Sequence, residues 1–239
     1  MRGCLFTLLL GIVAVGLLVT LGLPAVAAGL LTGAVTAAGL QADDTTVTVS
    51  SNPPTDLIGL HADEVRITAS DASFRGVRIG SLDITLHGVD LPSRTANEID
   101  GRLRKVSLDD GSQPSVALSS VRLSGGGDVV RASSTIPAAD ARALVADAVG
   151  SAVGTRPSSV TLSAPDAVRI RLGGATVHGK LSITGSGDLV ADIIDGPAAG
   201  ERVTVISAES ESLIRLTDVA VTGTGGLRLT GRLAVGLLG

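Results

Sequence analysis

Aromatic side chains are almost absent from this sequence. Its 239 residues include no Trp, no Tyr and two Phe. Single-stranded nucleic acids and glycans are commonly bound by stacking on aromatic faces, so this composition disfavours both as ligands. Asp and Glu (23) outnumber Lys and Arg (19), which leaves a polyanion no obvious basic surface. We therefore expect no nucleic-acid partner.

Cysteine and histidine are scarce too. The single cysteine, Cys4, cannot form an intrachain disulfide, and it stands near the start of an apolar run. His61, His87 and His178 are far apart in the sequence, and none belongs to a close pair with the spacing of zinc ligands. The sequence predicts no metal site and no cofactor.

Common catalytic and nucleotide-binding motifs are missing. The sequence has no G-x-S-x-G nucleophile elbow. Residues 223–228 (GTGGLR) begin like a dinucleotide-binding loop, but Arg228 stands where the third glycine is required. Neighbouring carboxylates, such as Asp63 and Glu64, are more typical of solvated turns and strand edges than of catalysis. We predict that the protein is not an enzyme. An envelope enzyme whose catalytic residues meet only in the fold is the remaining alternative.

One long segment near the N-terminus carries no charge. It covers residues 3–42, and within it residues 5–23 form 19 nearly continuous apolar positions. About 20 such residues span the hydrocarbon core of a bilayer as a helix. Arg2 precedes the run and Asp43 follows it, so the positive-inside bias keeps the N-terminus cytoplasmic. We predict a single-pass signal-anchor in the cell membrane, with the main domain outside the cytoplasm.

Two features of this region stay open. Residues 25–27 (AVA) resemble a cleavage site, so the alternative to an uncleaved anchor is secretion after cleavage near Ala27. Residues 25–40 are rich in Ala, Gly and Leu. They either continue the membrane segment or form a short apolar helix that packs under the folded domain. We assign residues 1–42 to the anchor and this short helix, and residues 43–239 to a β-rich extracytoplasmic domain.

Beyond residue 43 the sequence is typical of β-strands. Apolar and polar residues alternate with a period of two, which gives each strand one apolar and one polar face. Turn-forming pairs such as Asp100-Gly101 and Gly173-Gly174 separate the runs. The pattern favours antiparallel strands that are wet on one side. Examples of the alternating apolar positions are Val47, Val49, Val65, Ile67, Val77, Ile79, Val168, Ile170, Leu227 and Leu229.

The alternation changes phase twice between residues 77 and 91. Apolar positions are odd at Val77 and Ile79, even from Leu82 to Leu86, and odd again from Val89, with Gly80 and Gly88 near the changes. A bulge or bend at each glycine would let one long strand curve while its apolar face stays on the same side. The alternative is two ordinary turns.

One segment, residues 136–150, has helical periodicity. Its apolar stripe includes Ile136, Leu144 and Val149, and Pro137 suits the first turn of a helix. A single amphipathic helix needs a sheet to lie against, so we expect a mainly β, α+β domain. The motif at 62–67 recurs loosely at 165–170. This faint repeat suggests two halves, 43–134 and 155–239, joined by the helix.

Two stretches carry a family resemblance: PPTDLIGLHADEVRI at 53–67 and FRGVRIGSLDITLHGV at 74–89. A Pro-led Leu-x-Gly stretch, a Val-x-Ile strand and a Leu-x-Leu strand after an apolar segment resemble the LmeA-like family of actinobacterial envelope proteins. The likeness is clearest over about residues 45–125 and looser over 155–239. It implies an extracytoplasmic phospholipid-binding domain, with a long curved antiparallel sheet wrapped on a helix as in tubular lipid-binding folds.

The residues themselves favour the same ligand class. Strand faces of Val, Ile and Leu without aromatics would give acyl chains a smooth aliphatic lining, although a dry β core would show the same pattern. Arg75 and Arg78 are candidate contacts for a lipid headgroup. The candidate lining residues are Val65, Ile67, Val77, Ile79, Leu82, Ile84, Leu144 and Val149.

Two functions from different classes follow from these observations. The first is a membrane-anchored protein that holds or shuttles phospholipid, or a lipid-linked glycan precursor, in biogenesis of the cell envelope. The second is a structural envelope scaffold with a dry β core and no lipid ligand, whose exposed strand edges pair with partners.

Overall fold

The chain is described from a computed structural model that covers residues 28–29, 40–74, 77–90, 92–93, 95–108, 117–126, 129–196, 198–207 and 214–233. These residues form antiparallel sheets, one short 3-10 helix and one long α-helix. They fall into two compact units. Unit 1 contains Met1–Leu103 and Ser124–Asp128, and unit 2 contains Arg104–Leu123 and Val129–Gly239. The expected class, mainly β with one amphipathic helix, is confirmed for this part of the chain.

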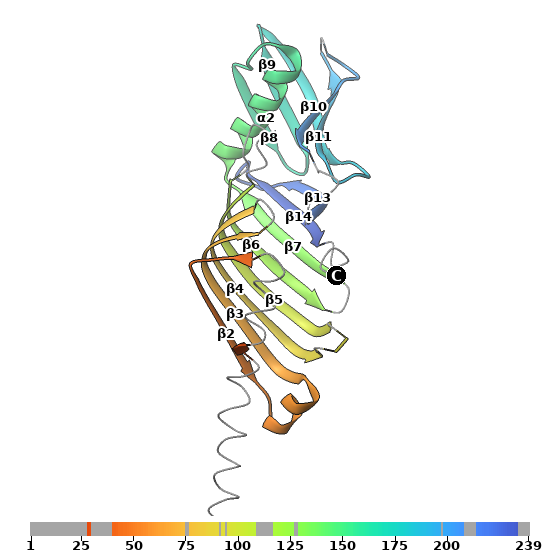
Figure 1. Cartoon of the computed structure of the whole chain (residues 1–239). Coiled ribbons are helices and arrows are strands. Elements are labelled where there is room, and N and C mark those ends of the chain that lie inside the picture. The colour runs from red at the N-terminus through yellow and green to blue at the C-terminus, as the bar shows by residue number, and fades with distance from the viewer. Residues whose placement is uncertain are drawn as a thin grey trace, which may run out of the picture. The chain divides into compact units, whose positions relative to one another are not determined.

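Long strands joined by hydrogen bonds build unit 1 (Figure 1). They are ordered β1-β3-β4-β5, and β2 also pairs with β3. Val, Ile and Thr recur along them, and β-branched side chains favour the pleated backbone. The elements are β1 (Leu40–Gln41), β2 (Asp44–Ser50), η1 (Pro54–Gly59), β3 (His61–Phe74), β4 (Val77–Asp90) and the first part of β5 (Thr95–Leu108).

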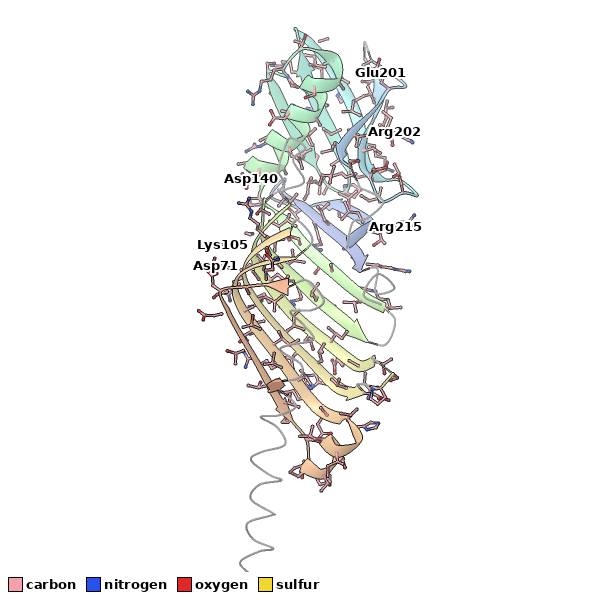
Figure 2. All side chains as sticks on the ribbon, viewed as in Figure 1. Asp71, Lys105, Asp140, Glu201, Arg202 and Arg215 are labelled. Carbon is pink, nitrogen blue, oxygen red and sulfur yellow. The ribbon has the colours of Figure 1, made fainter. Side chains whose placement is uncertain are left out.

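Strands β3 and β4 pair along their whole length and change phase together. Asp71 on β3 has φ +46°, and Gly88 on β4 has φ +57°. A residue with positive φ in a strand breaks the side-chain alternation, and Gly tolerates it at no steric cost. The break near Gly88 is therefore confirmed within the 14-residue strand β4, and the break near Gly80 coincides with Asp71 on the paired strand β3. The alternative of two turns is wrong, because β4 is continuous. Figure 2 places Asp71 where the strand bends.

The apolar core of unit 1 lies at the end of the strands next to η1. Its buried members come from η1 and from four strands, and Ala28 packs against them. Residues 28–29 are helical. Because Ala28 packs on this core, residues 25–40 contact the folded unit at this point. The buried members are Val47, Val49, Leu57, Ala62, Val65, Val89 and Ala96.

Unit 2 combines two sets of antiparallel strands with the long helix. One set is ordered β6-β7-β14-β13 and the other β12-β11-β10-β9-β8. The elements are β6 (Ala117–Gly126), which ends in unit 1, β7 (Val129–Ile136), α2 (Ala138–Val153), β8 (Ser159–Ser163), β9 (Ala167–Leu172), β10 (Ala175–Ile183), β11 (Leu189–Asp195), β12 (Arg202–Ile206), β13 (Ile214–Val221) and β14 (Leu227–Leu233).

Helix α2 packs on the five-stranded sheet of unit 2. It contacts β8 and β12, and it buries Ala141, Leu144, Val145 and Val149 at the spacing of one helical face. Gly154 ends the helix with φ +69°, a left-handed conformation that favours glycine. The predicted helix at 136–150 is confirmed, with ends shifted by two and three residues.

The prediction is wrong for Ile136. This residue ends β7 and lies opposite Leu227 on β14 instead of starting the helix. The cause is local, because a residue before proline is pushed away from helical backbone angles and Pro137 follows directly.

The membrane-segment prediction falls on residues 5–23, outside the described residues. Within the described part of the chain, no helix combines the length and the apolar character that crossing a bilayer requires.

Candidate functional site

A continuous set of aliphatic side chains shares one face of strands β2, β3 and β4. Directly opposite residues of antiparallel strands point to the same face, and alternate residues along a strand do so too. Ile67 lies opposite Val47 on β2 and opposite Ile84 on β4. We name the set the aliphatic face; it comprises Val47, Val49, Val65, Ile67, Ala69, Leu82, Ile84 and Leu86.

Exposure varies across the aliphatic face. Val65 is 1% exposed and Leu82 8%, whereas Ile67, Ile84 and Leu86 are only partly buried. Partly exposed aliphatic groups next to buried ones leave apolar area that another apolar surface can cover. A hydrocarbon chain gains about 25 cal/mol for each Å² of apolar surface it removes from water, and it needs no hydrogen-bonding partner.

The opposite face of the same strands is polar and charged. On β3 and β4, Arg66 and Asp83 form two hydrogen bonds: Nε donates to Oδ1 at 3.0 Å, and an Nη atom donates to Oδ2 at 2.9 Å. The hydrogen bond to Asp83, and then its charge, raise the pKa of Arg66 above its ordinary value. This face is therefore solvated. Only the aliphatic face of the sheet is suited to an apolar ligand.

Two other predicted lining residues lie beyond the bend at Asp71. Ile79 is 5% exposed and lies opposite Ala72, which is 2% exposed. Val77 begins β4 opposite Phe74, and its side chain lies outside the described part.

The predicted headgroup contacts lie at this same end. Arg78 is an exposed residue of β4, opposite Ser73, and by strand alternation it points away from the face of Ile79. Arg75 lies outside the described residues.

The two predicted lining residues on α2 occupy a different core. Leu144 is 8% exposed and Val149 1% exposed, and both belong to the main apolar cluster of unit 2 together with Ile170, Leu181 and Leu189. Val65 belongs to the cluster of unit 1, and Ile67 packs against it. The structure thus brings together Val65, Ile67, Leu82 and Ile84 on one face of β3 and β4. It leaves Ile79 beyond the bend and assigns Leu144 and Val149 to another unit.

Four members of the aliphatic face are missing from the list of candidate lining residues. Val47 and Val49 follow the strand alternation, Ala69 continues that of Val65 and Ile67, and Leu86 continues that of Leu82 and Ile84. The missing information was the partner of β2, since periodicity predicts a strand but not which strand it pairs with. Register places Val47 beside Ile67 and Leu86 beside Val65.

Each histidine lies beside a carboxylate on the neighbouring strand. His61 Nε2 is 3.8 Å from Asp90, His87 Nδ1 is 3.8 Å from Glu64, and His178 Nδ1 is 3.0 Å from Asp195. These are exposed or partly exposed cross-strand pairs. The described residues contain no group of three or more side chains that could hold a metal ion.

Asp195 also accepts a hydrogen bond from the His178 backbone N–H at 2.9 Å. This bond, followed by the contact with the imidazole, lowers the pKa of Asp195 below its ordinary value.

Comparison with known proteins gives one match. The family model described as LmeA-like phospholipid-binding matches residues 18–232, which is most of the chain and extends over the greater part of each unit. No curated protein and no solved structure matches the chain significantly. The family match confirms the resemblance seen in residues 53–67 and 74–89.

Proposed function

This chain belongs to the LmeA-like phospholipid-binding family, and from that premise we propose that it holds or shuttles lipid outside the cytoplasmic membrane. The lipid is a phospholipid, whose acyl chains lie on the aliphatic face. The observation that carries the proposal is the register of Ile67 and Ile84, which sets two partly exposed side chains opposite each other among buried aliphatic neighbours.

The composition supports an apolar ligand. Every member of the aliphatic face is Val, Ile, Leu or Ala, and the set includes no charged side chain. The polar opposite face, with the Arg66–Asp83 pair, stays in water.

Membrane attachment belongs to the proposal as well. The charge-free residues 3–42, with Arg2 before them and Asp43 after, support a signal-anchor with a cytoplasmic N-terminus. Cleavage near Ala27 would instead release the domain outside the membrane. We assign the protein no catalytic step, since holding a lipid requires none.

A lipid-linked glycan precursor is the alternative cargo, because its lipid part could use the same aliphatic face. A scaffold with a dry core is the alternative function, and it requires no exchangeable lipid.

Native mass spectrometry of the full chain tests the proposal. The chain is transferred from detergent into an amphipol, and its retained lipids are then extracted and identified. We expect about one phospholipid per chain, and a loss of most of it in the double variant Ile67→Ser/Ile84→Ser. The matched control is Ile194→Ser, which changes a 65% exposed isoleucine in unit 2. Circular dichroism confirms that each variant is folded.

The outcomes separate the candidates. A chain without lipid, which stays without lipid after incubation with phospholipid vesicles, overturns the carrier function and favours the scaffold. Retention of a lipid-linked glycan alone keeps the carrier and changes its cargo. Equal lipid loss in the Ile194→Ser control removes the assignment of the aliphatic face.

A further inference from the structure

The connection between β2 and β3 exposes two large aliphatic side chains. Ile58 in η1 is 67% exposed, and Leu60, which directly follows η1, is 48% exposed. The described residues contain two other exposed large hydrophobic residues, Val129 and Ile194. Scattered single hydrophobic residues need no explanation, but two within three positions on one turn form a small apolar tip. In Figure 1 this turn is the orange coil between β2 and β3.

The turn is held in place by its own backbone and by the core. Leu57, which directly precedes Ile58, is buried in the core of unit 1. Its carbonyl accepts a hydrogen bond from the Leu60 N–H at 3.1 Å. Leu60 adopts φ +60°, a left-handed conformation uncommon for residues other than glycine. The exposed leucine is therefore displayed by an ordered turn.

The charge-free N-terminal run reaches the same end of unit 1. Ala28 packs against the cluster that contains Leu57. Leu23, the last residue of the apolar positions 5–23, precedes Ala28 by five residues. Five residues span at most about 17 Å when fully extended. A membrane that holds residues 5–23 therefore lies within that reach of Ala28, which contacts the same cluster that anchors η1 through Leu57.

We propose that Ile58 and Leu60 insert into the surface of the bilayer that holds residues 5–23. This inference rests on the membrane attachment proposed above. Leu57, which directly precedes Ile58, belongs to the same buried cluster as Val49 and Val65, so insertion of the tip brings the bilayer surface close to one end of the aliphatic face. Nearby carboxylates argue for a zwitterionic surface: Asp56 is exposed, and so is Asp63, whose Oδ2 accepts the Asn52 N–H at 2.7 Å.

The absence of tryptophan and tyrosine permits a direct test. In the full chain, Ile58→Trp introduces the only indole. The chain is reconstituted in phosphatidylcholine vesicles with brominated acyl chains, which quench indoles that enter the bilayer. Ile194→Trp is the matched control, because Ile194 is 65% exposed and lies in unit 2. We expect at least about twofold stronger quenching for Ile58→Trp than for the control, together with a blue-shifted emission.

Two further measurements keep the outcomes distinct. Carbonate extraction reports whether the chain remains in the bilayer, and lipid retention reports the carrier function. Equal, weak quenching of both indoles in a carbonate-resistant chain overturns the tip and leaves the anchor and carrier standing. Release by carbonate together with weak quenching overturns both the anchor and the tip. Strong quenching of the Ile58→Trp chain supports the tip whether or not lipid is retained.

Discussion

Ile67 on β3 lies directly opposite Ile84 on β4, and both side chains are only partly buried although their neighbours Val65 and Leu82 are 1% and 8% exposed. Together with Leu86, the pair marks the accessible part of a face whose other members are buried. Burial and access can therefore be separated by substitution, because the two kinds of position should respond differently.

Separate substitutions of Val65 and Ile84 should have different effects: the first should mainly lower stability and the second should mainly weaken lipid binding. Val65→Ala removes buried methyl groups and should lower the free energy of unfolding by about 2 kcal/mol. Ile84→Ala should cost about 1 kcal/mol or less, because part of that side chain is already in water, and should weaken phospholipid retention more than Val65→Ala does. Denaturant unfolding and native mass spectrometry measure the two effects. The reverse order of lipid loss would argue against Ile84 as a contact.

The core position on α2 gives a complementary prediction. Val149 is 1% exposed within the main cluster of unit 2, so Val149→Ala should lower the unfolding free energy by about 2 kcal/mol. Phospholipid retention by the folded variant should stay unchanged. If retention falls while stability is unaffected, Val149 lines the lipid site and the helix takes part in binding.

Gly88 provides a test of the bend in β4. Its φ of +57° is unfavourable for any residue with a Cβ, so Gly88→Ala should destabilise the protein by about 1–2 kcal/mol. An added Cβ would also collide with the Asn97 side chain at Nδ2, which can move aside. Gly223→Ala is the control, since Gly223 has open space around its Cβ position and no positive φ. Equal thermal stability of the two variants would show that the bend does not depend on Gly88.

Titration of Asp192 should make the free energy of unfolding depend on pH. Arg202 Nε donates to Asp192 Oδ1 at 2.6 Å, and Ser182 Oγ donates to Oδ2 at 2.8 Å. The hydrogen bond from Arg202 lowers the pKa of Asp192 most. Partial burial has a smaller, opposite effect, and the hydrogen bond from Ser182 lowers the pKa again, so that it stays below its ordinary value of 3.8. A carboxyl group with a lowered folded pKa stabilises the fold above its unfolded pKa. That contribution is lost as the pH falls through the folded value. Arg202, on β12, is labelled in Figure 2.

Asp192→Asn should therefore reduce the slope of unfolding free energy against pH at pH values below about 4. The effect at neutral pH should stay below about 1 kcal/mol, because the Asp192 side chain is 34% exposed and that of Arg202 62%. Ser182→Ala keeps the charged pair and should keep most of the slope. An unchanged slope in Asp192→Asn would assign the acid dependence to other carboxyl groups.

Much of the secondary structure could be predicted from the sequence, because it depends on interactions between residues close together in the chain. Period-two alternation identified the strands, and the phase changes near Gly80 and Gly88 identified a long irregular strand, since side-chain direction depends on each residue's own backbone. The helix followed from its stripe of apolar residues, although Pro137 moved its start past Ile136. Residues 53–67 and 74–89 sufficed for the family.

The tertiary structure decided which strands meet and in which register. The repeated motif shows this limit, because its two copies put Ile67 and Ile170 at equivalent positions: Ile67 lies opposite Ile84, whereas Ile170 lies opposite Val177 and Val160. The periodicity of a segment does not predict such pairings, because they depend on contacts between segments that are distant in the sequence. The sequence alone therefore determined a β-rich, aliphatic, aromatic-poor member of a lipid-binding family. Only the fold placed Val47 beside Ile67 on one face and assigned Leu144 and Val149 to another core.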